Sequence, residues 1–275
     1  MRFAKLHGLG NDFVLLDLRQ GGAPLPSARA VALCARHLGI GADGVLTLLP
    51  RGGAGSARDG RSPQSGGPSV RMLVQNSDGS VPEMCGNGAR CAALWIATDG
   101  CTRPGTASVM LHTDAGPRPC AVEATSARQG MVEVDMGLAR LDAPRALPLP
   151  NRRADAWSVS MGNPHRVLFE EGDPLALARE FGPVLCRAEN ANIEFARKLG
   201  PQRYQVSVYE RGAGLTQACG TGACAVAAAA VARGEASRGA PISVLLPGGE
   251  LVLRVDAENR VFMRGAAELV FTGEL

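Results

Sequence analysis

Met84-Cys-Gly-Asn-Gly-Ala89 and Ala218-Cys-Gly-Thr-Gly-Ala223 are near-copies of one motif, and each is followed by a run of alanine and other small apolar residues. These runs, Ala89–Thr98 and Ala223–Arg233, have the composition of helices. Each Cys-Gly-x-Gly is therefore expected at a helix start, where free backbone N–H groups favour an anion. The helix dipole and these donors are expected to lower the pKa of each cysteine thiol, and glycine lets a ligand approach the backbone.

A strand-like run precedes each motif, at Val70–Val74 and at Tyr204–Tyr209. The order of strand, polar loop, Cys-Gly-x-Gly and helix thus occurs twice. If the two units face each other around a pseudo-twofold axis, their thiols lie on either side of one cleft. A substrate carbon in that cleft can lose a proton to one thiolate and gain one from the other thiol, so the sequence predicts stereoinversion at a carbon acid.

Length and composition indicate a globular protein of two domains. The chain has 275 residues, of which 45% are hydrophobic, and domains commonly have roughly 100 to 200 residues. The net charge of +3 comes from interspersed acids and bases without a block of like charges, so no nucleic-acid partner is expected. No signal peptide and no membrane-spanning apolar run is apparent, so we expect a cytoplasmic protein without a membrane partner.

The eight cysteines show no CxxC and no Cys/His spacing of the zinc type, so they are interpreted as reduced thiols, and no metal site is expected. Cys91 and Cys224, on the two expected helices, are interpreted as small buried apolar residues. The only lysines are Lys5, in an expected strand, and Lys198, in an expected polar loop. A pyridoxal-phosphate enzyme needs a lysine for its Schiff base, and neither lysine lies beside a phosphate cradle, so no cofactor is expected.

The first half is expected to contain strands at 3–6, 13–18 and 45–49, and a helix from Ser27, as N-cap, to Gly39, as its C-terminal stop. Residues 51–69 lack periodicity and are interpreted as a surface insertion.

Further strands are expected near 107–113, 119–124 and 130–136, with the first domain ending around residue 128. The second half is expected to repeat the mix of strands with one prominent helix. The tail, 268–275, is strand-like.

Several further motifs complete a set that is specific as a whole. In this order, the chain resembles the diaminopimelate epimerase family nearly end to end, through His7-Gly-Leu-Gly-Asn-Asp-Phe13, Gly39-Ile-Gly-Ala-Asp43, Asn76-Ser-Asp-Gly79, Met84-Cys-Gly-Asn-Gly-Ala-Arg-Cys91, Met161-Gly-Asn-Pro-His165, and Glu210-Arg-Gly-Ala-Gly214 before the second cysteine motif.

The resemblance implies an α/β fold of two pseudo-symmetric domains, each a curved mixed β-sheet wrapped around a central helix, with the active site in the cleft between them. The implied N-terminal domain is 1–128, completed by a final strand at 266–275, and the C-terminal domain is 129–265. The family interconverts LL- and meso-2,6-diaminopimelate without pyridoxal phosphate, in lysine and peptidoglycan precursor biosynthesis. A cytoplasmic homodimer acting on a small amino-acid substrate is implied.

By the same resemblance, Cys85 and Cys219 are the base and acid pair, and His165 and Glu210 tune the thiol pKa values. The positions that match substrate-binding residues of the family are Asn11, Asn76, Gly86, Asn87, Asn163, Asn192, Glu210, Arg211, Gly220 and Thr221. The guanidinium fork of Arg211 suits a distal carboxylate of the substrate.

The chain departs from the family at Gly44, where a glutamine is frequent, at Leu215, where a glutamate is frequent, and in the 51–69 insertion. Three other interpretations stay open at this point. The first is a proline or hydroxyproline epimerase of the same fold, the second is a thiol redox or metal-binding protein, and the third is a non-catalytic binding module.

Overall fold

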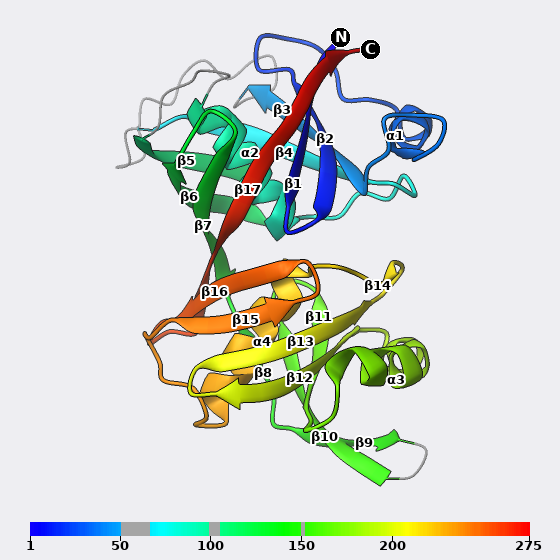
Figure 1. The fold of residues 1–275 in the computed structure, drawn as a ribbon, viewed down its shortest axis with the longest axis vertical. Coiled ribbons are helices and arrows are strands. Elements are labelled where there is room, and N and C mark those ends of the chain that lie inside the picture. The colour runs from blue at the N-terminus through cyan, green and yellow to red at the C-terminus, as the bar shows by residue number, and fades with distance from the viewer. Residues whose placement is uncertain (51–66, 99–104, 150–151) are drawn as a thin grey trace. The chain divides into compact units, whose positions relative to one another are not determined.

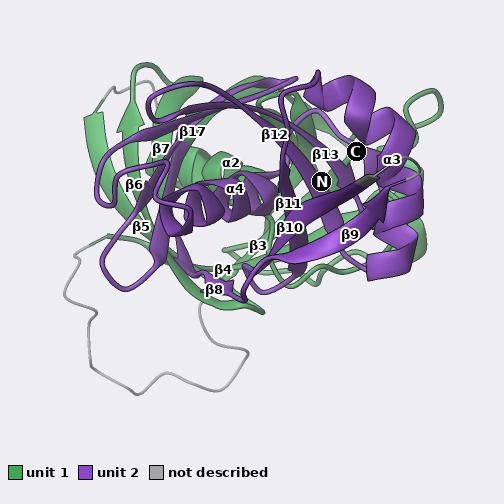
Figure 2. Cartoon of the chain, turned by 90° about the horizontal axis from the view of Figure 1, so that it is seen from below, with its two compact units in different colours: residues 1–134, 265–275 green, residues 135–264 purple. Residues whose placement is uncertain are grey.

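In a computed structural model, residues 1–50, 67–98, 105–149 and 152–275 are described. The contacts divide the chain into two compact units, residues 1–134 with 265–275, and residues 135–264 (Figure 2). The boundary expected near residue 128 precedes strand β7, whereas this division falls within it. Most of the expected 51–69 insertion, together with Cys101, lies outside the described residues.

The first unit contains a mixed β-sheet (Figure 1). β2 and β3 are parallel, as are β4 and β5, whereas the pairs β1–β2, β1–β17, β3–β4, β5–β6 and β6–β7 are antiparallel. Its strands are β1 (Arg2–Gly8), β2 (Asn11–Asp17), β3 (Gly44–Pro50), β4 (Ser69–Asn76), β5 (Gly105–Thr113), β6 (Gly116–Ala124), the first part of β7 (Gln129–Leu138) and the last part of β17 (Arg260–Glu274).

Helix α2 (Gly86–Thr98) is the centre of this unit and packs against β1 to β6. Nearly every one of its residues is buried, because its small side chains let strands approach from several sides. The alanine-rich run after the first cysteine motif is therefore helical, as expected.

Helix α1 (Ser27–Cys34) is shorter than expected. Its N-cap is Pro26, without a side-chain cap, and Ser27 is already the first helical residue, so the expected N-cap is wrong. The helix ends five residues before Gly39 because Ala35 is extended. Gly39 instead folds back onto the helix end, where a Cβ would lie 2.3 Å from the Ala32 carbonyl oxygen.

The second unit repeats the arrangement with mixed strands, which β17 joins to those of the first unit in one sheet. Its parallel pairs are β11 with β12 and β13 with β15. Its strands are β8 (Arg140–Leu141), β9 (Arg145–Leu149), β10 (Arg152–Ser160), β11 (Pro164–Phe169), β12 (Asn192–Gly200), β13 (Arg203–Glu210), β14 (Gly214–Leu215), β15 (Ile242–Leu246), β16 (Gly249–Val255) and the first part of β17.

Helix α4 (Gly220–Ala232) is the centre of the second unit and contacts β10, β11, β12, β15 and β16. Like α2 it lacks a polar face, and almost all of it is buried. The two centres of the fold are therefore the two alanine-rich helices that follow the cysteine motifs.

The expectation of one prominent helix in the second half is wrong, since α3 (Pro174–Glu189) is also present. The Gly182-Pro183 pair inside it has the appearance of a helix break, but Pro183 is accommodated within the helix. Gly182 is required by packing, because a Cβ there would lie 2.6 Å from the Tyr209 side chain. Lys198, expected in a loop, lies in β12 opposite Tyr204.

The final strand, β17, is continuous over 15 residues. Its beginning pairs with β16 of the second unit, and its end pairs with β1 of the first. The chain terminus thereby adds a strand to the unit in which the chain began, and the strand-like tail of the sequence is part of a longer element.

Candidate active site

The first cysteine lies directly before α2. The Cys85 side chain is half-buried, and the Gly88 backbone N–H donates to its Sγ over 3.4 Å. The Cys85 carbonyl accepts the first helical hydrogen bond, from Ala89 N at 2.8 Å. A Cβ at Gly88 would lie 2.8 Å from Leu46 Cδ2 and 3.6 Å from Sγ, so the second glycine of the motif leaves room beside the thiol.

The second cysteine has the same local geometry. Cys219 is the N-cap residue of α4, and its carbonyl accepts from Ala223 N at 3.0 Å. Its Sγ lies 3.6 Å from Thr221 Oγ1. A Cβ at Gly222 would lie 3.3 Å from Sγ and 2.9 Å from Glu194 Oε1, so the second glycine again permits close packing against the thiol.

The pKa of the Cys219 thiol is raised well above its usual value, so the lowering expected from the helix start is wrong for this residue. Burial is the largest cause, and the negative charges of Glu210 and Glu194 add to it. The hydrogen bonds of Thr221 and of the Gly222 N–H lower the pKa but do not outweigh burial. Cys219 therefore holds its proton at neutral pH in the ligand-free protein.

Glu210, at the end of β13, is a neighbour of this thiol. Burial raises its pKa, against the opposing effect of hydrogen bonds from the Thr216 hydroxyl and the Cys219 thiol and of the charge of His165. A carboxyl group with a raised pKa beside a thiol with a raised pKa is a pair suited to exchanging a proton.

His165 is fully buried on β11, and its nearest partner is a residue that the sequence interpretation missed. Its Nδ1 lies 2.6 Å from Oε1 of Glu194, whose side chain is also fully buried. Its Nε2 lies 3.0 Å from Oδ1 of Asn163, and Nδ2 of Asn163 lies 3.4 Å from Oγ1 of Thr221. The only sequence signal for Glu194 is a carboxylate within a strand of otherwise buried apolar residues, Ile193 to Ala196.

Two more of the expected substrate-binding residues lie together at the ends of neighbouring strands β12 and β13. Oδ1 of the buried Asn192 accepts from the backbone N–H of Arg211 at 2.8 Å. The Arg211 side chain is exposed, and its Nη1 lies 3.2 Å from Oδ1 of Asn190. The guanidinium is thus anchored on one side. In the first unit, the half-buried Asn76 donates to Ser80 Oγ at 2.9 Å.

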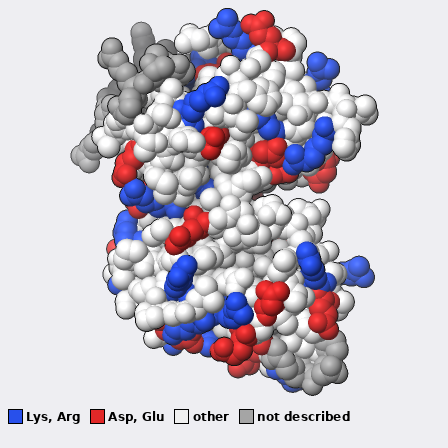
Figure 3. Space-filling view, in the orientation of Figure 1, with Lys and Arg blue, Asp and Glu red and all other residues white. Residues whose placement is uncertain are grey.

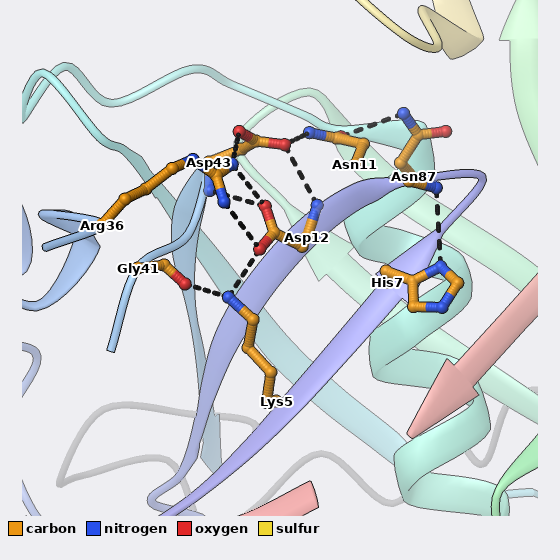
Figure 4. A network of polar contacts seen from close by, with 9 residues as sticks. Lys5, His7, Asn11, Asp12, Arg36, Gly41, Asp43 and Asn87 are labelled. Atoms are coloured by element: carbon orange, nitrogen blue, oxygen red, sulfur yellow. Dashed lines mark hydrogen bonds and ion pairs between the residues drawn. The ribbon is translucent and has the colours of Figure 1, made fainter. Parts of the chain in front are cut away.

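Asn11 and Asn87 belong to a polar network of the first unit (Figure 4). Asn87 Nδ2 donates to Asn11 Oδ1 at 3.0 Å, and Asn11 Nδ2 donates to Asp43 Oδ2 at 2.7 Å. Asp43 also pairs with Arg36 at 2.7 Å. Gly86 and Asn87 themselves form the start of α2, as Gly220 and Thr221 form the start of α4.

The described residues offer little to a metal or to pyridoxal phosphate. Within the described ranges, no three His, Cys, Asp or Glu side chains are grouped as a metal site. Lys5 is buried and pairs with Asp12 at 2.6 Å, so its amine is engaged. Cys91 and Cys224 are fully buried, and burial raises the pKa of Cys91 to about 12, which fits the apolar role expected for these cysteines.

On the face drawn in Figure 3, acidic and basic side chains are interspersed rather than gathered by sign. This distribution agrees with the small net charge of the sequence. In the part of the chain that the structure describes, no helix has the length and apolar character needed to cross a membrane.

Comparison with known proteins decides the family. Residues 3–141 and 157–270 match the diaminopimelate epimerase family. A diaminopimelate epimerase of Synechocystis sp. is 40% identical over 297 residues, covering 100% of this chain and 98% of the relative, and one of Synechococcus sp. (strain JA-3-3Ab) is 42% identical, covering 99% and 97%. The chain belongs to the diaminopimelate epimerase family. The family resemblance predicted from the sequence motifs is confirmed, and the family is one of isomerases.

Solved structures confirm the expected fold of two α/β units. A predicted epimerase from Pseudomonas aeruginosa has a TM-score of 0.72 at 17% identity, covering 100% of this chain and 98% of that chain. A hydroxyproline epimerase from Agrobacterium vitis has a TM-score of 0.72 at 14% identity, covering 99% and 91%. At these identities the likeness concerns the fold, so it does not favour hydroxyproline as substrate.

Proposed function

We propose that this member of the diaminopimelate epimerase family interconverts LL- and meso-2,6-diaminopimelate by inverting one α-carbon, with no cofactor. The observation that carries the proposal is the repeated site, a thiol at the start of a buried helix in each unit, in a chain about 40% identical to curated diaminopimelate epimerases over its whole length. By family resemblance we also propose a cytoplasmic homodimer.

The chemical difficulty lies in removing the α-proton of an amino acid, because the resulting carbanion needs its charge stabilised at the carboxylate. The backbone N–H groups of Gly86 and Asn87 at one helix start, and of Gly220 and Thr221 at the other, are proposed to hold that carboxylate. Preorganised donors of this kind contribute several kcal/mol to transition-state stabilisation.

Proton transfer is proposed to use both thiols. The Cys85 thiolate removes the α-proton from one face while the Cys219 thiol donates its proton to the other face, and the roles exchange for the opposite isomer. The raised pKa of Cys219 supports the acid role, since the residue keeps its proton until the carbanion forms. When Cys219 must be the base, Glu210, its hydrogen-bond partner, accepts the thiol proton.

Recognition of the long substrate is proposed to use polar groups beyond the reacting carbon. Arg211 offers a guanidinium fork for the distal carboxylate, and its backbone is held by Asn192. Glu210 and the amides of Asn76, Asn163 and Asn192 supply acceptors for the distal ammonium. Proline and hydroxyproline lack this second amino-acid end, which makes them the weaker candidates.

The test follows deuterium uptake into LL- and meso-diaminopimelate in D2O. The unmodified protein is expected to exchange the α-proton and to convert each isomer to the other, after dialysis against a chelator as well. Cys85→Ala and Cys219→Ala should each abolish conversion, whereas Cys34→Ala, a buried thiol of the α1 core, should not. Full activity of either site variant, loss of activity on chelation, or faster turnover of proline would contradict the proposal.

A further inference from the structure

Asp43 lies just before β3 and receives hydrogen bonds from three donors (Figure 4). Its Oδ2 accepts from Asn11 Nδ2 at 2.7 Å and from the backbone N–H of Asp12 at 3.1 Å. Its Oδ1 accepts from Arg36 Nη2 at 2.7 Å. An ionised carboxylate has no donor of its own, so each of these contacts has a fixed direction.

The direction of these hydrogen bonds determines how the side-chain amides of Asn11 and Asn87 are oriented. Because Asp43 only accepts, Asn11 must turn its NH2 group toward Asp43 and its oxygen toward Asn87, whose Nδ2 then donates to it at 3.0 Å. A flip of the Asn11 amide would place its oxygen against the carboxylate. Figure 4 shows the result, with the Asn87 amide oxygen on the side away from Asn11.

The base of the network is a cluster of ion pairs in which Lys5 and Asp12 are mostly buried and Arg36 is exposed. The Lys5 and Asp12 side chains are 9% and 16% exposed and are 2.6 Å apart. Arg36 bridges Asp12 Oδ1 at 2.9 Å and Asp43 Oδ1 at 2.7 Å. The Asp43 backbone N–H donates to the Asp12 carbonyl at 2.9 Å. Arg36 on one carboxylate oxygen, and Asn11 and the Asp12 N–H on the other, hold the Asp43 carboxylate in place, although its side chain is 40% exposed.

We propose that Asp43 is a positioning residue of the N-terminal half of the site, which sets the amide orientation of Asn11 and, through Asn11, that of Asn87. The inference rests on the proposed function for the role of these asparagines. Asn87 shares the start of α2 with Cys85, and its oxygen is the group that a substrate ammonium needs, since an ammonium only donates. Asp43 thus favours amino-acid substrates without touching them.

A double-mutant cycle tests this role through kinetics. Asp43→Ala should lower kcat/KM for diaminopimelate by about 5- to 30-fold, the effect of losing a charge-assisted hydrogen bond, mainly through KM. In an Asn11→Ala background, the same substitution should change kcat/KM by less than about 2-fold, because the side chain that links Asp43 to Asn87 is already absent. Equal losses in both backgrounds would overturn the positioning role.

A spectroscopic arm does not depend on activity. The side-chain NH2 resonances of Asn11 and Asn87 can be assigned from their loss in Asn11→Ala and Asn87→Ala. Asp43→Ala should shift the Asn87 pair as well as the Asn11 pair, because Asp43 is linked to Asn87 through the Asn11 side chain. Unmoved Asn87 resonances would overturn the positioning role of Asp43, whether or not the protein is active. Absence of diaminopimelate turnover in the unmodified protein would instead refute the proposed function.

Two controls separate positioning from folding. The chain has two lysines, so amine-reactive labelling should modify the exposed Lys198 and spare the buried Lys5 in Asp43→Ala if the base of the network is intact. If Lys5 becomes labelled, Asp43→Asn replaces the alanine variant in both the kinetic and the spectroscopic experiment, because asparagine has nearly the same side-chain volume as aspartate. Asp17→Asn is the matched control, because Asp17 lies in the same strand as Asn11 but pairs with Arg19 and Trp95, and its kcat/KM should be unchanged.

Discussion

At the scale of single residues, the two helix starts show how a common motif acquires different electrostatics. The Cys-Gly-x-Gly sequence is sufficient to predict the backbone around both thiols, because the start of a helix is a local property. The raised pKa of Cys219 was not predictable from it, since that shift comes first from burial of the thiol and then from Glu210 and Glu194, which β13 and β12 bring beside it. The local motif therefore sets geometry, and the sheet sets the charge environment.

This distinction predicts the effect of neutralising Glu210. Its charge helps to raise the Cys219 pKa, so Glu210→Gln should lower that pKa and increase the rate of Cys219 alkylation by iodoacetamide at pH 8, by several-fold. Mass spectrometry of the peptide containing Cys219 measures the rate, with the exposed Glu258→Gln as the control of equal charge change. An unchanged or slower rate in Glu210→Gln would show that the carboxylate does not repel the thiolate.

Arg211 carries the prediction on substrate specificity. Arg211→Ala should reduce kcat/KM for diaminopimelate by an amount equivalent to about 2 to 5 kcal/mol of transition-state binding, because the distal carboxylate loses its partner. Arg211→Lys should recover only part of this loss, since lysine keeps the charge but lacks the planar fork. Steady-state kinetics with diaminopimelate and with proline measure both effects. A comparable kcat/KM for diaminopimelate in all three proteins would remove Arg211 from substrate recognition.

At the scale of elements, the central helices were predictable and the peripheral ones less so. Alanine has the highest helix propensity, and α2 and α4 cover the two alanine-rich runs almost completely. The end of α1 lies earlier than expected, because Ala35 is extended and Gly39 folds back onto the helix end. The start of α3 does have a local signal that was missed, since Asp173 caps the helix directly before Pro174. Neither glycine marks the end of a helix here, since α1 ends five residues before Gly39 and Gly182 lies inside α3.

The close packing at the start of α4 predicts that Gly222→Ala is harmful. The new Cβ would lie 2.9 Å from Glu194 Oε1 and 3.3 Å from both Cys219 Sγ and Val208 Cγ2, so buried groups must move. Overpacking of this kind costs about 1 to 3 kcal/mol, and displacement of the thiol should also lower kcat. Urea unfolding and turnover are the measurements. Gly105→Ala, where the Cβ would meet nothing within 4 Å, is the control that should match the unmodified protein.

At the scale of the molecule, most of the strand order could not be derived from composition or periodicity. The crossing of β17 from one unit to the other was expected through family resemblance alone, because no local signal reports the partner of a strand. The pairings of β1 with β2 and of β5 with β6, by contrast, follow from short connections between consecutive strands. Pairings between strands that follow one another in the sequence were therefore predictable, whereas pairings between distant strands were not.

The two units should respond to acid with opposite signs. In the first unit, burial alone would raise the pKa values of Asp12 and Asp17, but the contacts of Arg36 and Lys5 with Asp12, and of Arg19 and Trp95 with Asp17, outweigh it and lower both. A folded-state pKa below the unfolded value of about 3.9 stabilises the unit above that pH, and the contribution disappears as the pH falls through the folded value. Glu210 in the second unit has a raised pKa, so protonation there favours the folded state as the pH falls.

Hydrogen exchange measured between about pH 5 and pH 2, and corrected for intrinsic rates, tests this expectation. Protection should fall earlier in β1 and β2, which carry or flank these aspartates, than in β12 and β13. Asp12→Asn should be less stable at pH 7 but should lose less protection on acidification, because the group that titrates is gone. Equal loss in both units, or an unchanged acid response in Asp12→Asn, would mean that the ion pairs of Asp12 with Lys5 and Arg36 do not govern acid stability.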